Sequence, residues 1–516
     1  MGATGRARKL RWLSLTRRTV QAAFLAFFIV LVFKAAYPPL STPSSNIFLR
    51  FDPLAGFFSI LAARNASVFV RYWPAWILLG LTLLGSRFFC GWICPLGTCF
   101  DAVGAIKPDA VKYYRPGGRE MKERLARSRE GTLPRRFRVK YVLLAVVLAL
   151  ALFGINLLYF ASPLVVMNLS MYYILLPQIP VLFLILIIIA LVYRPRFWCQ
   201  EICPLGALLA LFSMAGKRLW AKLSPLSIYK DSEACVSCGA CYRDCPFGVE
   251  EPYIKQESGA LRSGDCTSCG ACVSACPAEG ALALTSFGAK LCTSRGRRAT
   301  ERLSLPAPAA PEAHMGLTVT RREFVGSLGL GAVLATGYVI GLRDLSEPVL
   351  RMPGAQDESR FLAECNRCAE CTRTCPVGCI KPMGLEDGFQ RLWTPRLYPR
   401  TAGCLFDECN HACARVCPAG AIRYQKPEDV KIGLAHVNSR TCLGYRGRLC
   451  LVCMERCRFD AIKADGLRPI INTEKCTGCG ACEQTCPTDP ASIVVFPLGE
   501  TPSWPPGAGR RRQSRK

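Results

Sequence analysis

Cysteine spacing restricts this chain more than any other feature of its sequence. The 516 residues include 31 cysteines, and most of them lie two or three residues apart. Disulfide-bonded scaffolds are usually short chains whose cysteines are spread out to close loops, so close neighbours indicate metal ligands instead. Twenty-four of the cysteines form six sets of four. The sets are Cys235, Cys238, Cys241 and Cys245; Cys266, Cys269, Cys272 and Cys276; Cys365, Cys368, Cys371 and Cys375; Cys404, Cys409, Cys413 and Cys417; Cys442, Cys450, Cys453 and Cys457; and Cys476, Cys479, Cys482 and Cys486.

Four sets, those beginning at Cys235, Cys266, Cys365 and Cys476, have the spacing C-x2-C-x2-C-x3-C-P. In this pattern three thiolates hold three corners of a [4Fe–4S] cluster, and the fourth cysteine ligates the neighbouring cluster. Zinc is the alternative, but structural zinc sites commonly use two well-separated pairs of ligands. We therefore expect iron–sulfur clusters in these four sets.

The two remaining sets depart from this spacing. The set at Cys404 has longer gaps, and the set at Cys442 has seven residues in its first gap and Arg458 where proline is expected. A loop absorbs longer gaps easily, so the chain is expected to bind up to six [4Fe–4S] clusters. Altered geometry or another metal is the alternative at these two sets.

The two sets nearest the N-terminus are expected to exchange their fourth cysteines, as the spacing rule requires. Gly239 and Gly270 permit the tight wrap of the loop that brings backbone N–H groups to the cluster. The expected sites are Cys235, Cys238, Cys241 and Cys276, and Cys266, Cys269, Cys272 and Cys245.

Apolar runs indicate a membrane protein. The mean hydropathy is +0.22 although the net charge is +28. Runs near bilayer-spanning length occupy 20–33, 74–89, 141–160, 174–192 and 324–342, and the shorter run 52–63 is expected to be an interfacial helix. The arginines cluster beside these runs and follow no RNA- or DNA-binding pattern. Membrane lipid is therefore the expected partner, and nucleic acid is not.

Basic residues set the orientation. Residues 1–18 carry six Lys and Arg and residues 105–140 carry twelve, whereas residues 161–173 carry none. The positive-inside rule then makes the N-terminus and the 105–140 loop cytoplasmic, and four spans return the chain to the cytoplasm near Arg194. No histidine lies in those spans and no C-x-x-C-H occurs, so no haem is expected.

Proton-coupled chemistry on a quinone would need polar groups at the membrane edges. Asp52, Arg50, Arg71 and Tyr72 are the candidates, with ordinary interfacial anchors as the alternative interpretation. The stretch SLGLGAV at 327–333 resembles a GxGxxG motif but lacks a βαβ context, so no nicotinamide or flavin site is expected.

A second repeat lies in the membrane region. Arg87-FF-Cys90-GWI-Cys94-PLG and Arg196-FW-Cys199-QEI-Cys203-PLG are near copies, which predicts two duplicated helical hairpins. Cysteines four apart share a helix face, so the four thiols are candidates for a metal, a further cluster or a reversible disulfide. Buried structural cysteine is the alternative. The candidate redox or metal residues are Cys90, Cys94, Cys199 and Cys203, while Cys99, Cys292 and Cys379 are taken as ordinary thiols.

An export-like segment lies inside the chain. Arg321 and Arg322 precede Phe324 and an apolar run, and the preceding stretch is rich in Arg, Pro and Ala. The pattern indicates a twin-arginine signal that stays as a fifth span, with a plain membrane anchor as the alternative. Both interpretations place the residues that follow outside the cytoplasm. The twin-arginine route carries folded proteins, which suits clusters loaded in the reducing cytoplasm.

The expected fold class is a membrane α-helical protein, with a four-helix domain, one further span and α+β domains of bacterial-ferredoxin type. The expected domains are 1–198, the four-span membrane domain; 199–292, a cytoplasmic two-cluster ferredoxin; 293–319, a disordered linker; 320–343, the twin-arginine signal or anchor; 344–497, an exported four-cluster ferredoxin; and 498–516, a disordered basic tail. The expected location is the cytoplasmic membrane, multi-pass, with 199–320 inside and 344–516 outside.

Both halves resemble known families. Residues 15–290, with paired C-x3-C-P motifs at span ends and a two-cluster ferredoxin, resemble the NapH family, which shares its outline with NosR and CcoG. Residues 316–497, with the twin-arginine start, Arg351-MPGA and the cysteine sets from Cys365 to Cys486, resemble NapG/MauM ferredoxins. The resemblance implies a quinol dehydrogenase module that uses the quinone pool and passes electrons to a separate periplasmic reductase.

The resemblance also implies how the four later sets share ligands. The outer sets would pair with each other, and so would the inner sets. The implied sites are Cys365, Cys368 and Cys371 with Cys486; Cys476, Cys479 and Cys482 with Cys375; Cys404, Cys409 and Cys413 with Cys457; and Cys442, Cys450 and Cys453 with Cys417.

The chain is thus interpreted as a membrane-bound iron–sulfur electron-transfer protein rather than a terminal catalytic subunit. Two alternatives stay open. One is a membrane thiol or metal reductase that uses the C-x3-C-P cysteines, and the other is a maturation factor for a partner redox enzyme.

Overall fold

The structure, a computed structural model, describes residues 3–35, 46–63, 68–106, 137–152, 154–156, 162–193, 195–220, 226–236, 238–249, 258–294, 318–319, 325–326, 329, 333, 348–388 and 390–498. The expected twin-arginine segment lies outside the described residues except for four positions. Nearly all of the expected linker and tail lie outside them too.

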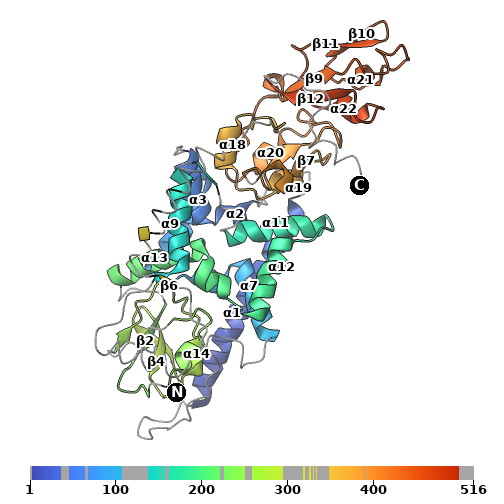
Figure 1. Ribbon diagram of the computed structural model, residues 1–516. Coiled ribbons are helices and arrows are strands. Elements are labelled where there is room, and N and C mark those ends of the chain that lie inside the picture. The colour runs from blue at the N-terminus through green and yellow to red at the C-terminus, as the bar shows by residue number, and fades with distance from the viewer. Residues whose placement is uncertain are drawn as a thin grey trace.

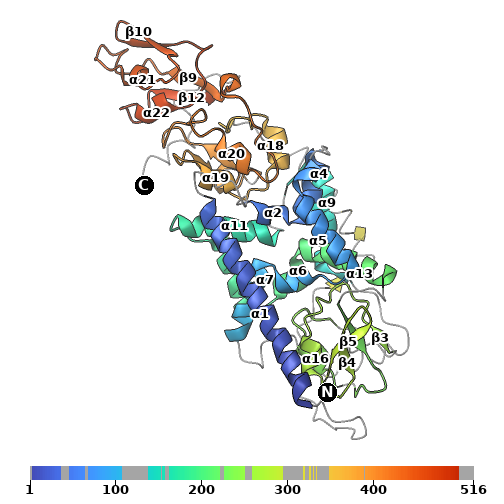
Figure 2. The same cartoon turned by 180° about the vertical axis from the view of Figure 1, so that it is seen from behind.

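Three parts follow one another along an elongated molecule (Figure 1). A first cluster body, residues 226–294, lies at the same end as the N-terminus. A helical layer, residues 3–220, occupies the middle, and a second cluster body, residues 348–498, lies at the far end. Seen from behind, α1 runs from the first body through the layer towards the second (Figure 2).

Among its described residues, the helical layer contains α1 and eleven shorter helical segments. Their bounds are α1 Ala3–Lys34, α2 Ile47–Arg50, α3 Pro53–Ala63, α4 Val68–Arg71, α5 Trp73–Leu84, α6 Phe88–Trp92, α7 Pro95–Ile106, α9 Val139–Leu152, α11 Pro163–Leu175, α12 Val181–Val192, the π-helix Trp198–Ile202 and α13 Pro204–Leu219. Helix α13 packs against α5 and α9. It therefore belongs to the layer rather than to the first cluster body.

The apolar helices are shorter than the apolar runs in the sequence. Among the described residues, only α1, over Ser14–Lys34, is long and apolar enough to cross a membrane, which is a weak sign of membrane association. Helices α5, α9 and α12 have 12, 14 and 12 residues, about 18–21 Å at 1.5 Å per residue, against a hydrocarbon core of about 30 Å. Gly85 follows α5, Gly154 follows α9, and Pro177 and Pro180 separate α11 from α12. Glycine and proline thus break runs that hydropathy alone joins together.

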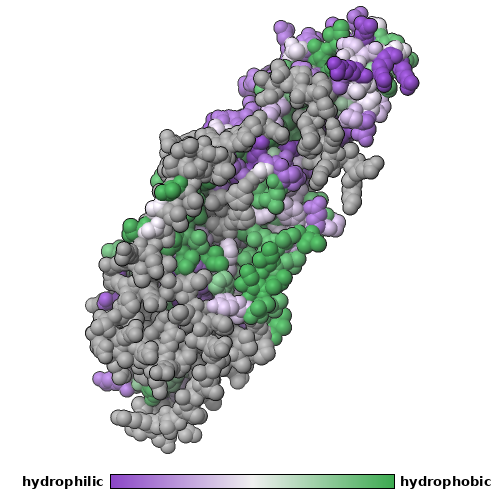
Figure 3. Space-filling model, in the orientation of Figure 1, coloured by the Kyte–Doolittle hydropathy of each residue, from purple (hydrophilic) through white to green (hydrophobic). Residues whose placement is uncertain are grey.

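Apolar side chains also cover the outside of the layer. Ile188 and Val192 of α12 are 56% and 77% exposed, and Phe33 of α1 is 62% exposed. Figure 3 shows apolar residues gathered on the middle of the visible face, where α12 runs in Figure 1. Contiguous exposed apolar surface of this kind marks contact with a membrane or a partner. Helix α3, expected at an interface, instead buries Leu54 and Phe58 and packs against α5, α9 and α13.

The first cluster body is a four-stranded antiparallel sheet with two short helices. The strand order is β3-β2-β4-β5, with β2 Ser227–Lys230, β3 Gly259–Ala260, β4 Leu282–Ser286 and β5 Ala289–Thr293. Helices α14, Ala240–Arg243, and α16, Ala271–Ala275, pack against each other. Strand β1, Phe137–Arg138, pairs with β6, Thr318–Val319.

The second cluster body contains two halves. The first half has α18 Glu358–Glu364, α19 Glu370–Thr374, β7 Ile380–Pro382, the 3-10 helix Leu385–Asp387, β8 Pro395–Leu397 and α20 Ala412–Val416. The second half has the 3-10 helix Pro427–Asp429, β9 Gly433–Val437, α21 Val452–Glu455, β10 Ile462–Asp465, β11 Arg468–Ile471, α22 Ala481–Thr485 and β12 Ile493–Pro497. The antiparallel pairs are β7 with β8, β9 with β12, and β10 with β11.

Two buried arginines from the duplicated hairpins join the layer to the first body. The guanidinium carbons of Arg87 and Arg196 lie 4.8 Å and 4.5 Å from the centre of the Phe247 ring. Arg87 Nη1 donates to Gly206 O at 3.1 Å, and Arg196 Nη1 donates to Cys90 O at 3.0 Å. Each arginine therefore reaches into the other hairpin, and the ring of Phe247 lies between the two cations.

A carboxylate beside the second cysteine set completes this contact. Asp265 receives hydrogen bonds from Lys140, and Arg87 Nη2 lies 3.4 Å from its Oδ1. Burial would raise the pKa of Asp265, but the charges of Lys140, Arg87 and Arg138 outweigh it and hold the pKa well below the usual value.

Amide side chains join the layer to the second body. Asn168 Nδ2 donates to Cys368 O at 2.6 Å, and Asn156 Nδ2 donates to Cys365 O at 2.9 Å. Asn46 Nδ2 donates to Val416 O at 2.6 Å. The layer thus binds the backbone of the cysteine loops directly, which fixes the second body on its far face.

Replacing Asp265 with Asn should destabilise the junction with the first body. The substitution removes the charge that compensates Lys140 and Arg87, and breaking a buried ion pair costs about 3–5 kcal/mol. The free energy of unfolding of purified full-length protein measures the loss, and Glu233→Gln at an exposed position is the matched control. Because the folded-state pKa is lowered, this stability is present above about pH 4 and is lost as the pH falls below it. An unchanged unfolding free energy in D265N would contradict the ion-pair account.

Candidate iron–sulfur sites

In the first cluster body, the cysteines gather as the spacing predicts. One cavity is lined by Cys245, Cys266, Cys269 and Cys272. The charges of Cys235 and Cys238 act on Cys276, which places that thiol with the first set. The two sets therefore exchange their fourth cysteines.

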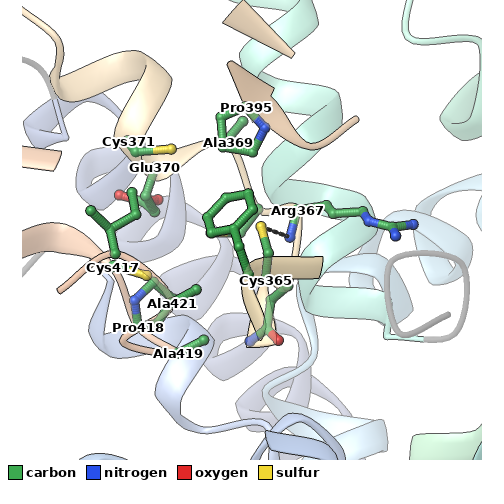
Figure 4. A pocket seen from close by; sticks show the side chains of 14 residues that line it. Cys365, Arg367, Ala369, Glu370, Cys371, Pro395, Cys417, Pro418, Ala419 and Ala421 are labelled. Atoms are coloured by element: carbon green, nitrogen blue, oxygen red, sulfur yellow. Dashed lines mark hydrogen bonds between the residues drawn. The ribbon is translucent and has the colours of Figure 1, made fainter. Parts of the chain in front are cut away.

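In the second cluster body, the expected pairing of the sets is wrong. Adjacent sets pair, rather than outer with outer and inner with inner. One cavity is lined by Cys365, Cys368, Cys371 and Cys417; a second is lined by Cys375, Cys404, Cys409 and Cys413; and a third is lined by Cys442, Cys450, Cys453 and Cys486. Cys457 lies beside Cys479, which groups it with the last set. Figure 4 shows Cys365, Cys371 and Cys417 around the first of these cavities.

Local packing explains why neighbours pair. The short helix that carries the third cysteine of one set packs against its counterpart in the next set, α19 against α20 and α21 against α22. Closing the shorter loop also costs less chain entropy than joining the first set to the last. Each pair of adjacent sets therefore forms its own two-site unit.

A left-handed residue starts the helix of the third cysteine in five of the six sets. Gly239, Gly270 and Gly480 have φ of 72°, 76° and 83° there. Ala369 and His411 take the same conformation at φ 61° and 50°. Glycine adopts this conformation without the steric cost that a Cβ brings, so the sequence signal was clear only where glycine stands.

The donor set fits iron–sulfur clusters. The four cavities have similar sizes, 330 to 360 Å³. Backbone N–H groups point at the thiols, for example Arg367 N at 3.4 Å from Cys365 Sγ and Ala461 N at 3.3 Å from Cys457 Sγ. Hydrogen bonds of this kind to the sulfurs help set cluster potentials. Within the described part of the chain, no group of three or more His, Cys, Asp or Glu side chains is arranged to hold a single metal ion.

Burial disfavours the thiolate form of some of these cysteines, among them Cys365 and Cys241. It raises the pKa of Cys365 to about 11 and that of Cys241 to about 12. Thiolates are the ligating form, so binding of iron must displace protons from these buried groups.

The sites of the second body lie in a row. The site of Cys365 contacts the helical layer through Asn156 and Asn168. The site of Cys404 includes Cys375, which belongs to the preceding cysteine set and directly follows α19. On its other side, Cys404 N donates to Cys479 O at 2.8 Å. The site of Cys404 therefore lies between the layer-side site and the two sites of the second half.

The four C-x3-C-P cysteines come together where the layer meets the first body. The charges of Cys90, Cys199 and Cys203 act on Cys94, so the two hairpins bring their thiols to one place. Cys203 precedes α13 and accepts a hydrogen bond from Gly206 N at 3.3 Å. Cys90 and Cys199 also pack against the core that contains Cys266.

Two features escaped the sequence reasoning. Asn156 and Asn168 bind the cysteine loops. The signal of Asn156 was an amide inside the apolar run 141–160, whereas Asn168 lies in the stretch 161–173 between two runs. Cys379, taken as an ordinary thiol, instead lines the cavity of Cys404 with its Sγ 3.5 Å from Cys375 Sγ. In the sequence, Cys379 was recognisable as a fifth cysteine that follows Cys375, the last cysteine of a regular set, by four residues.

Iron content can test the pairing of adjacent sets. Replacing Cys365, Cys368 and Cys371 with Ala should remove about four iron atoms, one [4Fe–4S] cluster, from anaerobically purified protein. Adding Cys417→Ser should then cost no further iron, because that thiol has already lost its cluster. Adding Cys486→Ser instead should remove iron from another site. The reverse result, with Cys486→Ser silent and Cys417→Ser costly, would restore the pairing of outer sets.

Comparison with known families agrees with this geometry. A family model for a 4Fe-4S dicluster domain matches residues 227–277, and models for 4Fe-4S binding domains match residues 362–378 and 469–491. A further 4Fe-4S binding domain model matches twice, at 72–109 and 175–222, once over each C-x3-C-P hairpin. No solved structure matches the chain significantly.

Individual relatives point the same way. The methylamine utilization ferredoxin-type protein MauM of Paracoccus denitrificans is 36% identical over 210 residues, which are 37% of this chain and 87% of MauM. The ferredoxin-type protein NapG of Escherichia coli is 33% identical over 200 residues, 34% of this chain and 86% of NapG. The chain is thus an iron–sulfur electron-transfer protein with several [4Fe–4S] sites, and it belongs to the family of ferredoxin-type proteins that includes MauM and NapG.

Proposed function

We propose that this chain is a quinol dehydrogenase module, in which a NapH-type membrane part and a NapG/MauM-type ferredoxin are fused. It takes electrons from membrane quinol and passes them to a separate extracytoplasmic redox enzyme. The observation that carries the proposal is the contact of one cysteine site with Tyr72, a buried side chain of the helical layer that lies near the buried Asp52. Clusters in the cysteine sites supply one-electron carriers when bound.

The exposed apolar surface of the layer supports a multi-pass membrane domain. In the proposal, α1, α5, α9 and α12 belong to its four spans, of which α1 alone is long enough by itself among the described residues. Hydrogen bonds near the two ends of α1 link it to both faces of the layer. Gln21 of α1 donates to Gly91 O on the first-body side, and Ala35 O accepts from Thr374 of the second body. Thirteen residues lie between Gln21 and Ala35, and the fourteen helical steps from one to the other rise about 21 Å.

The connection between the two cluster bodies supports a fifth span. Strand β6, Thr318–Val319, pairs with β1, and Arg138 of β1 donates to Phe247 O of the first body. Leu350 lies in the core of the second body. Val319 and Leu350 thus lie at opposite faces of the layer, so a twin-arginine anchor between them would have to cross it.

Asp52 and Tyr72 form the quinol-side proton group of the proposal. Both side chains are fully buried. Asp52 receives a hydrogen bond from Ser162 and lies at the start of α3, where Leu54 N donates to it at 2.9 Å. Burial raises the pKa of Asp52 to about 6, against the opposing effect of these hydrogen bonds. A carboxyl with this pKa exchanges protons near neutral pH and so can serve as a base for quinol.

Tyr72 connects that carboxylate to the nearest cysteine site. Asn366 Nδ2, from the loop between Cys365 and Cys368, donates to Tyr72 Oη at 2.8 Å. Tyr72 interacts electrostatically with both Asp52 and Cys417. A quinol deprotonated here would release its electrons beside the layer-side site of the second body.

The C-x3-C-P thiols form a further redox centre in the proposal. Asp52 acts electrostatically on Cys203, so the proton group lies between these thiols and the second body. Gly206 N donates to Cys203 Sγ, and the buried Arg87 and Arg196 interact electrostatically with Cys90, so both would stabilise thiolate ligands. The match of a 4Fe-4S binding domain model to both hairpins favours a cluster over a purely structural role.

Substituting the proton group should slow reduction by quinol and leave the cysteine sites intact. Asp52→Asn should lower the rate of quinol-dependent reduction, followed by EPR, by about 100-fold, the usual loss of a general base. The wild-type rate should rise as the pH passes about 6, the pKa of Asp52, and the variant should lose that rise. Tyr72→Phe should slow the same step.

Reduction by dithionite separates this role from damage to the clusters. Both variants should reach the wild-type EPR signal with dithionite, and Tyr424→Phe in the second body should match the wild type in every assay. Quinol that never reduces the wild-type clusters would defeat the proposed function. Unchanged rates of quinol-dependent reduction in Asp52→Asn and Tyr72→Phe would rule out the role of these two residues but leave the proposed quinol oxidation standing.

Replacing all four C-x3-C-P cysteines with Ala should lower the iron content of the protein. The six other sets keep their ligands, so the EPR signals that depend on them should persist. Cys99→Ala, on α7 beside the first hairpin, is the matched control and should leave iron unchanged. Iron equal to that of the wild type in the quadruple variant would assign these cysteines a structural or thiol-exchange role.

A further inference from the structure

One cavity of the second body has a cysteine more than the others. The cavities around Cys365, Cys266 and Cys442 are each lined by four cysteines. The cavity around Cys404 is lined by five, namely Cys375, Cys379, Cys404, Cys409 and Cys413. A [4Fe–4S] cluster uses four thiolates, so one of these thiols must do something else.

The spacing and the fold identify Cys379 as the extra thiol. Cys375 precedes a proline and closes a regular set, in the position that Cys245 and Cys486 occupy in theirs. Cys379 follows Gly378, whose φ of +64° turns the chain back, and it immediately precedes β7. Its carbonyl accepts from Tyr398 N at 2.8 Å, and only 1% of the residue is exposed. The thiol is therefore held in place rather than free to rotate into solvent.

The position of Cys379 corresponds to a hydrogen-bond donor in related sites. Four residues after Cys245, Val249 N lies 3.4 Å from the ligand sulfur, and four residues after Cys457, Ala461 N lies 3.3 Å from it. Cys486 has a side-chain partner as well, because Thr488 Oγ1 lies 3.2 Å from its sulfur. At Cys375 the fourth residue brings a thiol, with the two sulfurs 3.5 Å apart.

We propose that Cys379 is a potential-setting residue, which donates its S–H to the thiolate of Cys375 and raises the reduction potential of the cluster held at this site. Reduction adds negative charge that the ligand sulfurs share. A donor aimed at one of those sulfurs therefore stabilises the reduced form more than the oxidised form.

A raised reduction potential matters for electron transfer because of where the Cys404 site lies in the second body. The site lies between the layer-side site and the two sites of the second half. A higher potential here favours movement of an electron from the layer-side site onto this site. The inference concerns the chain's own thiol and does not depend on quinol as the electron donor.

Redox titration of anaerobically purified full-length protein, followed by EPR, tests the role. In Cys379→Ala one component of the titration should move to lower potential by about 60 mV, which corresponds to a tenfold change in the one-electron equilibrium. Cys379→Ser keeps a donor and should stay at or above the wild-type value. Cys292→Ala, which removes a buried cysteine of the first body outside the six sets, should change nothing.

Iron content decides between a donor and a ligand. Both Cys379 variants should retain wild-type iron, whereas Cys375→Ala should lose a cluster. Loss of about four iron atoms in Cys379→Ala would make Cys379 a ligand and overturn the proposal. Wild-type midpoint potentials in Cys379→Ala would overturn it as well, as would iron retained in Cys375→Ala through replacement by Cys379.

Discussion

Three thiols on one tight loop cannot close a four-cornered site, and this constraint organises both cluster bodies. The missing corner must come from another set, so cysteine sets occur in interlocked pairs. In the first body, Cys245 and Cys276 are exchanged. In the second body, Cys375 and Cys417 are exchanged in the first half and Cys457 and Cys486 in the second. Loss of one cluster therefore leaves one thiol of the neighbouring set without a metal. The stability of each pair of sets thus depends on both of its clusters being bound.

The helical layer holds the two bodies by different chemistry. Cations join the first body, where Arg87 and Arg196 enclose Phe247 and Asp265 compensates the charge. Neutral amides join the second, through Asn46, Asn156 and Asn168. A buried ion must be paired with an opposite charge, whereas a neutral amide needs only hydrogen-bond partners such as backbone carbonyls. Both arrangements bring cysteine sites against the layer, as the proposed transfer of electrons from quinol requires.

The sequence predicts the elements whose chemistry is local, and it fails where tertiary contacts decide. Spacing alone groups Cys266, Cys269 and Cys272 with Cys245. Glycine predicts the left-handed start at Gly239, but Ala369 reaches the same conformation without any sequence signal. Hydropathy reads the end of α11 and all of α12 as one apolar run, although Pro177 separates the two helices. Because of breaks of this kind, only α1 is long enough to span a membrane among the described helices. The partner of each set in the second body depends on how α19 meets α20, which spacing cannot reveal.

The chemical identity of the six cysteine sets underlies every step from fold to function. Iron and acid-labile sulfide, counted per chain in anaerobically purified full-length protein, test it most directly. Six [4Fe–4S] sites require about 24 iron atoms and as many sulfides, with a further increment from the C-x3-C-P thiols. Stoichiometric zinc in place of iron, or far fewer than about 20 iron atoms per chain, would contradict the account.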